Sequence, residues 1–217
     1  MSELKKRILT SFCLFIVLFF SFLSFKFFLI LLLIINFLAL DEFVKIIKKI
    51  YVRKNFSKLV ATFSIFLYMS VFSIIIYMFL IKSFEISKIY FLFLLMISIS
   101  TDIGGFIFGR IIGGKKLTKI SPNKTYSGVL GSLIFSVIVG FSFYFIQNKL
   151  TIDVTILFIF IIFISILSQL GDLFISLIKR KAKIKDTGNF LPGHGGILDR
   201  IDGMLLALPI GIIFLTI

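Results

Sequence analysis

Long apolar runs separated by short polar segments dominate the hydrophobic pattern of this 217-residue chain. A membrane-spanning helix needs about 20 mostly apolar residues, and continuous runs favour helices over the alternating strands of a membrane barrel. The pattern therefore predicts an all-α polytopic membrane protein with about seven transmembrane helices in one bundle. The expected spans are 8–25, 27–40, 59–81, 89–109, 128–146, 154–178 and 203–217.

Composition and charge agree with a membrane location. Hydrophobic residues make up 59% of the chain, and the net charge is +14. In a soluble protein such a charge would favour nucleic acid, but here the basic residues follow topology, and no nucleic-acid partner is expected. Of the 24 Lys and Arg residues, 20 fall before the first span and in alternate connecting segments, which places the N-terminus inside and the C-terminus outside.

The segment 41–58 differs from the other connections. Apolar residues recur in it at helical spacing, with lysines between them. It predicts either an amphipathic helix on the inner membrane surface, where its lysines would attract anionic lipid, or a plain basic loop. The apolar positions are Phe43, Ile46, Ile47, Ile50 and Tyr51, and the lysines are Lys45, Lys48 and Lys49.

Two spans carry small residues at every fourth position. Such ridges allow helix backbones to approach closely in lipid, so packing is the favoured interpretation and they do not identify a site. One ridge is Thr101, Gly105, Gly109 and Gly113, and the other is Gly128, Ser132, Ser136 and Gly140.

Polar residues form one stripe on the span 154–178, which a lipid-facing helix would not tolerate. Asp172 within it, and Asp102 in an earlier span, are intramembrane carboxylates, which are usually functional. Five other acidic residues, Glu42 among them, lie at span ends or in loops and are expected to have no function. The stripe consists of Ser165, Ser168, Gln169, Asp172, Ser176 and Lys179.

The loop that follows this span concentrates charge and glycine. Its cations, Lys179, Arg180, Lys181, Lys183 and Lys185, can neutralise phosphates, and Gly193, Gly195 and Gly196 let backbone N–H groups approach an anion. Asp199 and Asp202 share one helical face, and such hard oxygen ligands suit Mg²⁺. Together these residues favour phosphoryl chemistry on a charged lipid.

This stretch resembles the signature of the phosphatidate cytidylyltransferases, also called CDP-diglyceride synthases. The resemblance covers 101–202, which we expect to be the catalytic region of a single domain, 1–217, while 1–58 supplies N-terminal spans and the surface helix. The matching residues are Ser176, Lys179-Arg180, Lys185-Asp186, Gly188, Leu191-Pro192-Gly193-His194-Gly195-Gly196, Asp199-Arg200 and Asp202.

A second block is similar to the family's loop from Gly-Arg to Ser-Pro-x-Lys-Thr. It runs from Thr101-Asp102 through Gly109-Arg110 to Ser121-Pro122-Asn123-Lys124-Thr125 and Gly128. The family usually continues with Trp-Glu-Gly, whereas this chain has Tyr126-Ser127-Gly128. The missing glutamate leaves an inactive relative as one alternative.

The resemblance implies transfer of CMP from CTP to phosphatidic acid in a bacterial inner (plasma) membrane. Mg²⁺ is the implied cofactor, with a second cation beside it, and a homodimer is a further candidate. A CTP-dependent polyprenol or phytol kinase and an ion-coupled transporter remain the alternatives.

Asp172, Asp199 and Asp202 are expected to bind metal, with Asp102 either a further ligand or a helix-orienting residue. Lys179, Arg180, Lys185 and Arg200 are expected to hold phosphates, and Ser121, Lys124, Thr125, Ser176, Asp186, His194, Gly195 and Gly196 to complete the substrate site.

Overall fold

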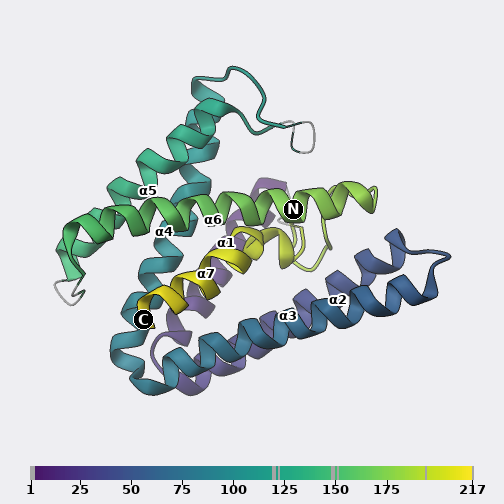
Figure 1. Cartoon of the computed structure of the whole chain (residues 1–217), viewed down its shortest axis with the longest axis horizontal. Helices are drawn as coiled ribbons and strands as arrows, with labels where there is room; N and C mark the ends of the chain where they lie inside the picture. The colour runs from purple at the N-terminus through teal and green to yellow at the C-terminus, as the bar shows by residue number, and fades with distance from the viewer. Residues whose placement is uncertain are drawn as a thin grey trace. The chain divides into compact units, whose positions relative to one another are not determined.

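The part of the chain that the structure describes contains seven helices and no strand. This computed structural model describes residues 3–118, 121, 123–147, 150, 152–193 and 195–216. The predicted all-α fold is confirmed (Figure 1). The helices are α1 (Glu3–Ser21), α2 (Phe25–Ile50), α3 (Asn55–Lys82), α4 (Phe84–Ile111), α5 (Tyr126–Gln147), α6 (Val154–Lys181) and α7 (Leu198–Thr216).

The chain divides into two compact units, each built from separate segments of the sequence. Unit 1 comprises Met1–Ile81 and Ile178–Ile201, so it holds α1 to α3, the end of α6 and the start of α7. Unit 2 comprises Lys82–Leu177 and Asp202–Ile217, with α4, α5 and most of α6 and α7. The prediction of a single domain stays a prediction.

Within unit 1, α2 and α3 run side by side, as Figure 1 shows. Asn36 on α2 donates hydrogen bonds to the Met69 carbonyl oxygen, at 2.9 Å, and to the Ser73 hydroxyl on α3. A polar side chain buried between apolar helices is stable only with such partners. This amide therefore fixes the register of the α2–α3 pair.

The separate surface helix predicted for 41–58 does not form. Instead α2 continues to Ile50, a turn follows, and α3 begins at Asn55. No proline or glycine interrupts α2 after its apolar part, and Phe43, Ile46 and Ile47 are buried inside the protein. The helical spacing of these residues was interpreted correctly, but protein, not lipid, covers the apolar face.

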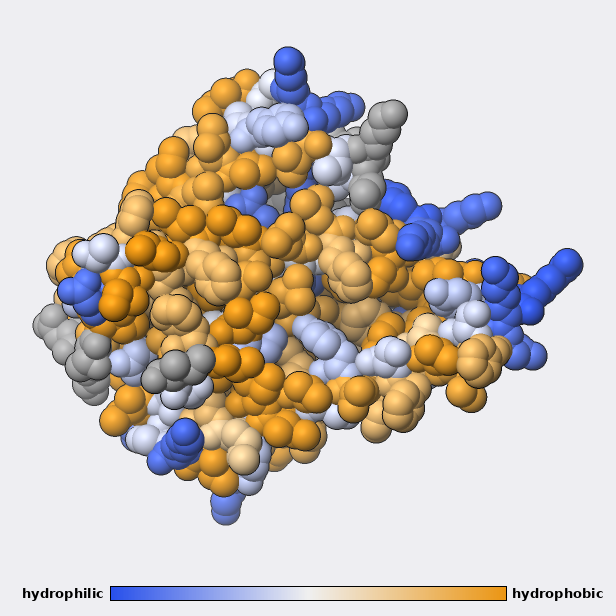
Figure 2. Space-filling view, viewed as in Figure 1, coloured by the Kyte–Doolittle hydropathy of each residue, from blue (hydrophilic) through white to orange (hydrophobic). Residues whose placement is uncertain are grey.

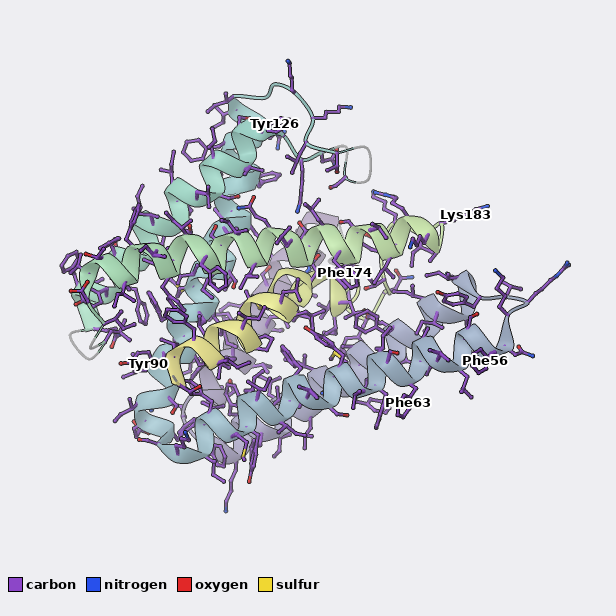
Figure 3. The ribbon with its side chains drawn as sticks, in the orientation of Figure 1. Phe56, Phe63, Tyr90, Tyr126, Phe174 and Lys183 are labelled. Atoms are coloured by element: carbon purple, nitrogen blue, oxygen red, sulfur yellow. The ribbon has the colours of Figure 1, made fainter. Side chains whose placement is uncertain are left out.

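Five of the helices in the described chain, α2 to α6, are long and apolar enough to cross a membrane. Apolar residues cover most of the face shown in Figure 2, and strongly hydrophilic ones gather at helix ends. Phe56 and Phe63 on α3 point outward in Figure 3 and are 81% and 65% exposed. Together with five helices of membrane-spanning length, this exposed apolar surface indicates contact with lipid, and the chain is an integral membrane protein.

The two small-residue ridges serve packing, as predicted, and the structure shows that they pack α4 against α5. A Cβ added at Gly105 would lie 2.7 Å from Ser132 Oγ, and one added at Gly128 would lie 2.9 Å from the Gly105 carbonyl oxygen. Real Cβ atoms essentially never come this close. Gly113 and Gly140 depart from the ridges, because Gly113 follows the end of α4 and Gly140 packs against Ile161 of α6.

Candidate functional site

The chain reverses direction at the end of α6, within the basic run 179–185. The Ile184 N–H donates to the Lys179 carbonyl and the Lys183 N–H to the Arg180 carbonyl, both at 3.0 Å. This Schellman pattern requires one residue at positive φ, and Lys183, labelled in Figure 3, occupies it at φ 55°. The reversal returns the chain from α6 toward the start of α7 within unit 1.

Asp199, in the first turn of α7, accepts hydrogen bonds from the loop 182–197. Its Oδ1 lies 2.7 Å from Lys179 Nζ, and its Oδ2 accepts from the Thr187 N–H at 2.8 Å and the Gly196 N–H at 3.0 Å. Burial raises the pKa of this carboxyl, but the hydrogen bonds from Lys179, Gly196 and Thr187 outweigh burial and hold its pKa below the ordinary value. Asp199 is therefore ionised at neutral pH.

Glycines allow the loop to close around this carboxylate. Gly193 and Gly195 adopt φ values of 78° and 83°, which other residues rarely adopt. The Leu191 N–H donates to the Gly195 carbonyl at 2.9 Å and closes a tight turn between them. A Cβ at Gly195 would lie 2.8 Å from Asp199 Oδ2, so glycine is required here for both conformation and space.

Four other charged signature residues of unit 1 present their side chains to its surface. Ser176, in contrast, is buried in unit 2. His194 lies outside the described residues, so its predicted role stays a prediction. The exposed signature residues are Arg180, Lys185, Asp186 and Arg200.

A pocket of ≈ 280 Å³ lies within unit 2. Its walls come from α4, α5, α6 and the loop before α5, and polar residues from every wall line it. Ser121, Lys124 and Thr125, predicted to bind substrate, line it together with Asp172 and Asp102. Asn123 and Gln169 also line it, although the sequence assigned them no binding role. Gln169 belongs to the predicted polar stripe, and Asn123 to the Ser-Pro-x-Lys-Thr block, so both could have been proposed.

Asp172 pairs with a cation inside this pocket. Its Oδ2 forms an ion pair with Lys124 Nζ, and the Ser176 hydroxyl donates to its Oδ1 at 3.3 Å. The Asp172 and Lys124 side chains are each 25% exposed. The pair thus joins the Ser-Pro-x-Lys-Thr block to the stripe on α6, two parts of the sequence that were interpreted separately.

The polar stripe of α6 faces the protein interior, as predicted. Ser165 and Ser168 are buried, and Ser165 Oγ accepts from Thr101 Oγ1 at 2.8 Å. Glycines bring α6 and α7 into backbone contact: a Cβ at Gly171 would lie 2.6 Å from the Asp202 carbonyl oxygen. The contact brings the Asp202 backbone close to the residue that precedes Asp172.

The loop before α5 ends in a helix cap. Thr125 Oγ1 accepts from the Gly128 N–H at 3.1 Å and so satisfies one free donor of the first turn. Ser127, where the family resemblance predicts glutamate, donates to the Gly113 carbonyl oxygen and lies 2.9 Å from Thr125 Oγ1. Ser127 therefore supports the loop that carries Lys124 and Thr125.

A magnesium ion binds through one or two carboxylates together with water and substrate phosphates. In neither unit do three or more His, Cys, Asp or Glu residues of the described chain gather at metal-binding distance. The pocket of unit 2 offers two carboxylates, Asp102 and Asp172, among hydroxyl and amide oxygens, and this donor set fits Mg²⁺. In unit 1, Asp199 Oδ2 accepts from two backbone N–H groups and lies 3.0 Å from the Thr187 hydroxyl, so this oxygen does not fit a further ligand.

Comparison with known proteins gives one family. The model of the cytidylyltransferase family matches residues 46–217, which is more than half of the chain. The matched segment includes the whole pocket of unit 2 and the loop around Asp199.

Individual relatives agree with the family match. A phosphatidate cytidylyltransferase of Staphylococcus haemolyticus is 44% identical over 122 residues, 56% of this chain and 46% of the relative. Proteins of the same name from Bacillus subtilis and Rickettsia bellii are 42% identical over 111 residues and 44% identical over 117 residues. These two matches cover 51% of this chain each, and 41% and 51% of the relatives. The chain thus spans about half the length of the curated relatives it matches.

Proposed function

The chain belongs to the cytidylyltransferase family, and from this premise we propose that it transfers CMP from CTP to phosphatidic acid. The products would be CDP-diacylglycerol and pyrophosphate, in keeping with the name of its relatives. One observation carries the proposal: the pocket of unit 2 gathers Ser121, Lys124, Thr125 and Asp172, four residues predicted for the substrate and metal sites from two separate motifs.

The proposed reaction is a displacement at phosphorus. A phosphate oxygen of phosphatidic acid forms a bond to the α-phosphorus of CTP, and the bond to the bridging oxygen breaks so that pyrophosphate leaves. The nucleophile is already an anion, so no strong general base is needed. The main barrier is repulsion between two polyanions, which positioning and charge neutralisation lower.

Cations of this chain would supply that neutralisation. Lys124 lies in the pocket, where phosphates can replace Asp172 as its partner. We propose that four signature cations bind the phosphates of CTP and lipid, namely Lys179, Arg180, Lys185 and Arg200. Lys179 also forms an ion pair with Asp199, whereas the other three are exposed.

Mg²⁺ is the cofactor we propose, and Asp172 would hold it with Asp102 in the pocket of unit 2. Asp202, whose backbone touches Gly171, is the third candidate ligand. When bound, the ion would neutralise phosphate charge and polarise the phosphorus that is attacked. Asp199 as a ligand, and a second cation, stay predictions from the sequence.

We further propose that the N-terminus lies in the cytoplasm of a bacterial cell and the C-terminus outside. The alternation of basic segments supports this orientation, and bacterial relatives support an inner-membrane location. The acyl chains of the lipid substrate would remain in the bilayer, and only its headgroup would reach the pocket.

The test uses detergent-purified protein with CTP, Mg²⁺ and phosphatidic acid, and it measures which nucleotide product appears. Pyrophosphate release that depends on the lipid and is lost in Asp172→Asn would support the proposal. Asp41→Asn is the matched control, because Asp41 is an exposed carboxylate that pairs with Lys45. Release of CDP would identify a kinase, and no product from folded protein in lipid would contradict both enzymes.

A further inference from the structure

Glu42 is a carboxylate buried on α2, only 4% exposed. It lies outside residues 46–217, the segment that matches the family, and its position at the end of an apolar run gave it no function in the sequence analysis. Burial of a charged group is costly unless hydrogen bonds compensate for it. The partners of Glu42 are therefore informative.

The partners of Glu42 lie in the signature loop, residues 182–197 of unit 1, and at Leu198, the first residue of α7. Glu42 Oε1 accepts from the Ile197 N–H at 2.9 Å, and Oε2 accepts from the Leu198 N–H at 3.0 Å. The Thr187 hydroxyl donates to Oε2 at 2.7 Å. Helix α7 begins at Leu198, and its first N–H groups have no partner within the helix. Glu42 thus caps α7 from another helix, at the end where the dipole favours negative charge.

The loop leaves space for this carboxylate by using glycine. A Cβ added at Gly188 would lie 2.7 Å from Glu42 Oε1. A Cβ added at Gly196 would lie under 3.0 Å from both Glu42 oxygens. Two signature glycines therefore line the place that Glu42 occupies, and the loop is shaped around a side chain from outside the signature.

Thr187 connects Glu42 to Asp199. Its hydroxyl lies 2.7 Å from Glu42 Oε2 and 3.0 Å from Asp199 Oδ2, and its N–H donates to Asp199 Oδ2. One hydroxyl has one hydrogen, so it can donate to only one of the two carboxylates at a time. The Thr187 side chain therefore links Glu42 to Asp199, which is the ion-pair partner of Lys179.

We propose that Glu42 is a positioning residue for the reaction: it holds Thr187 and the start of α7 so that Asp199 and Lys179 keep their places. The inference rests on the proposed function for its catalytic consequence. The structural part of the inference, that Glu42 orders Thr187 and the start of α7, does not depend on that function and can be measured separately.

The test compares Glu42→Gln, Thr187→Val and Thr187→Ser with Asp41→Asn in lipid nanodiscs, by hydrogen exchange and by steady-state kinetics. Glu42→Gln keeps the shape of the side chain but replaces one acceptor by a donor that faces a backbone N–H. We expect faster exchange at Ile197 and Leu198 and unchanged exchange in α4 and α5.

We also expect kcat/KM of Glu42→Gln to fall about 10- to 100-fold, as for loss of a hydrogen bond to a charged group. Thr187→Ser should keep wild-type kinetics and Thr187→Val should lose activity, while Asp41→Asn should change neither measurement.

Several results would overturn the proposal. The first is wild-type exchange at Ile197 and Leu198 in Glu42→Gln, and the second is wild-type kcat/KM in this variant despite faster exchange at these residues. The third is equally faster exchange in every helix, which would show that Glu42 contributes to global stability and not to the loop alone. Inactivity of the unmodified protein would instead contradict the proposed function. In that case the exchange comparison still decides whether Glu42 orders the loop.

Discussion

Unit 1 and the pocket of unit 2 each contain an aspartate paired with a lysine, Asp199 with Lys179 and Asp172 with Lys124, but the two pairs differ in their surroundings. Asp199 has a side chain only 8% exposed, and it takes hydrogen bonds from Lys179, Thr187 and Gly196. Asp172 is 25% exposed, and besides Lys124 it has the Ser176 hydroxyl at 3.3 Å.

The difference separates two tasks within one proposed reaction. The loop around Asp199 is held by many hydrogen bonds within unit 1, including those to Glu42, and such preorganisation avoids reorganisation during the chemical step. The pocket pair has a flexible cation and unused acceptor capacity, so its members can change partners when phosphate or metal enters.

The largest effect is expected from Gly196→Ala in the loop. The added Cβ would lie under 3.0 Å from Thr187 Oγ1 and both Glu42 oxygens, so the loop must shift. A displacement of this kind can reduce activity about 100-fold, whereas overpacking costs only about 1–3 kcal/mol of stability. Activity and thermal unfolding should be measured together, with Asn189→Ala as the control because Asn189 is an exposed residue of the same loop. Activity close to that of the control would show that the loop tolerates displacement.

In the pocket, Lys124→Met and Asp172→Asn should each lower kcat/KM about 10- to 100-fold, the scale of a lost charged hydrogen bond. Thermal stability should change little, because partly exposed ion pairs contribute about 0–1 kcal/mol. The double variant should lose less than the product of the single losses, since the two groups act as a unit. Lys88→Met, which breaks the pair with Glu85, is the control. Independent effects of the two substitutions would contradict a shared role.

A smaller effect concerns acid stability. The pKa of Asp199 is lowered from its ordinary value of 3.8, so its ionised form stabilises the folded state above that value. This contribution is lost as the pH falls through the lowered pKa. The midpoint of thermal unfolding, measured from pH 7 to pH 3, should fall less steeply for Asp199→Asn than for the wild type. Parallel curves would show that the Asp199 carboxylate does not contribute, and Asp41→Asn should reproduce the wild-type curve.

The sequence predicted most of what depends on local pattern. The stripe on α6, the ridges of α4 and α5, and the grouping of Lys124 with Thr125 follow from helical periodicity and motif spacing. Glu42 was missed because its function depends on contacts with residues more than 140 positions away. A signal was present, since Glu42 and Ile46 are four residues apart and share the buried face of α2.

The pocket walls could not be predicted for a related reason. The stripe showed that Gln169 and Asp172 face the protein interior, but not which helices oppose them. That information comes from α4 and α5, whose contribution depends on how closely glycine allows their backbones to approach. Periodicity describes each helix alone, whereas a cavity belongs to several helices at once.

The glycine contact between α4 and α5 also has a consequence for biosynthesis. The two helices are consecutive in the chain, and their contact at Gly105 and Gly128 is between backbones. Association of inserted helices in lipid depends on such close packing. This hairpin can therefore assemble as soon as α5 leaves the ribosome, so that two walls of the pocket exist before α6 delivers Asp172 to it.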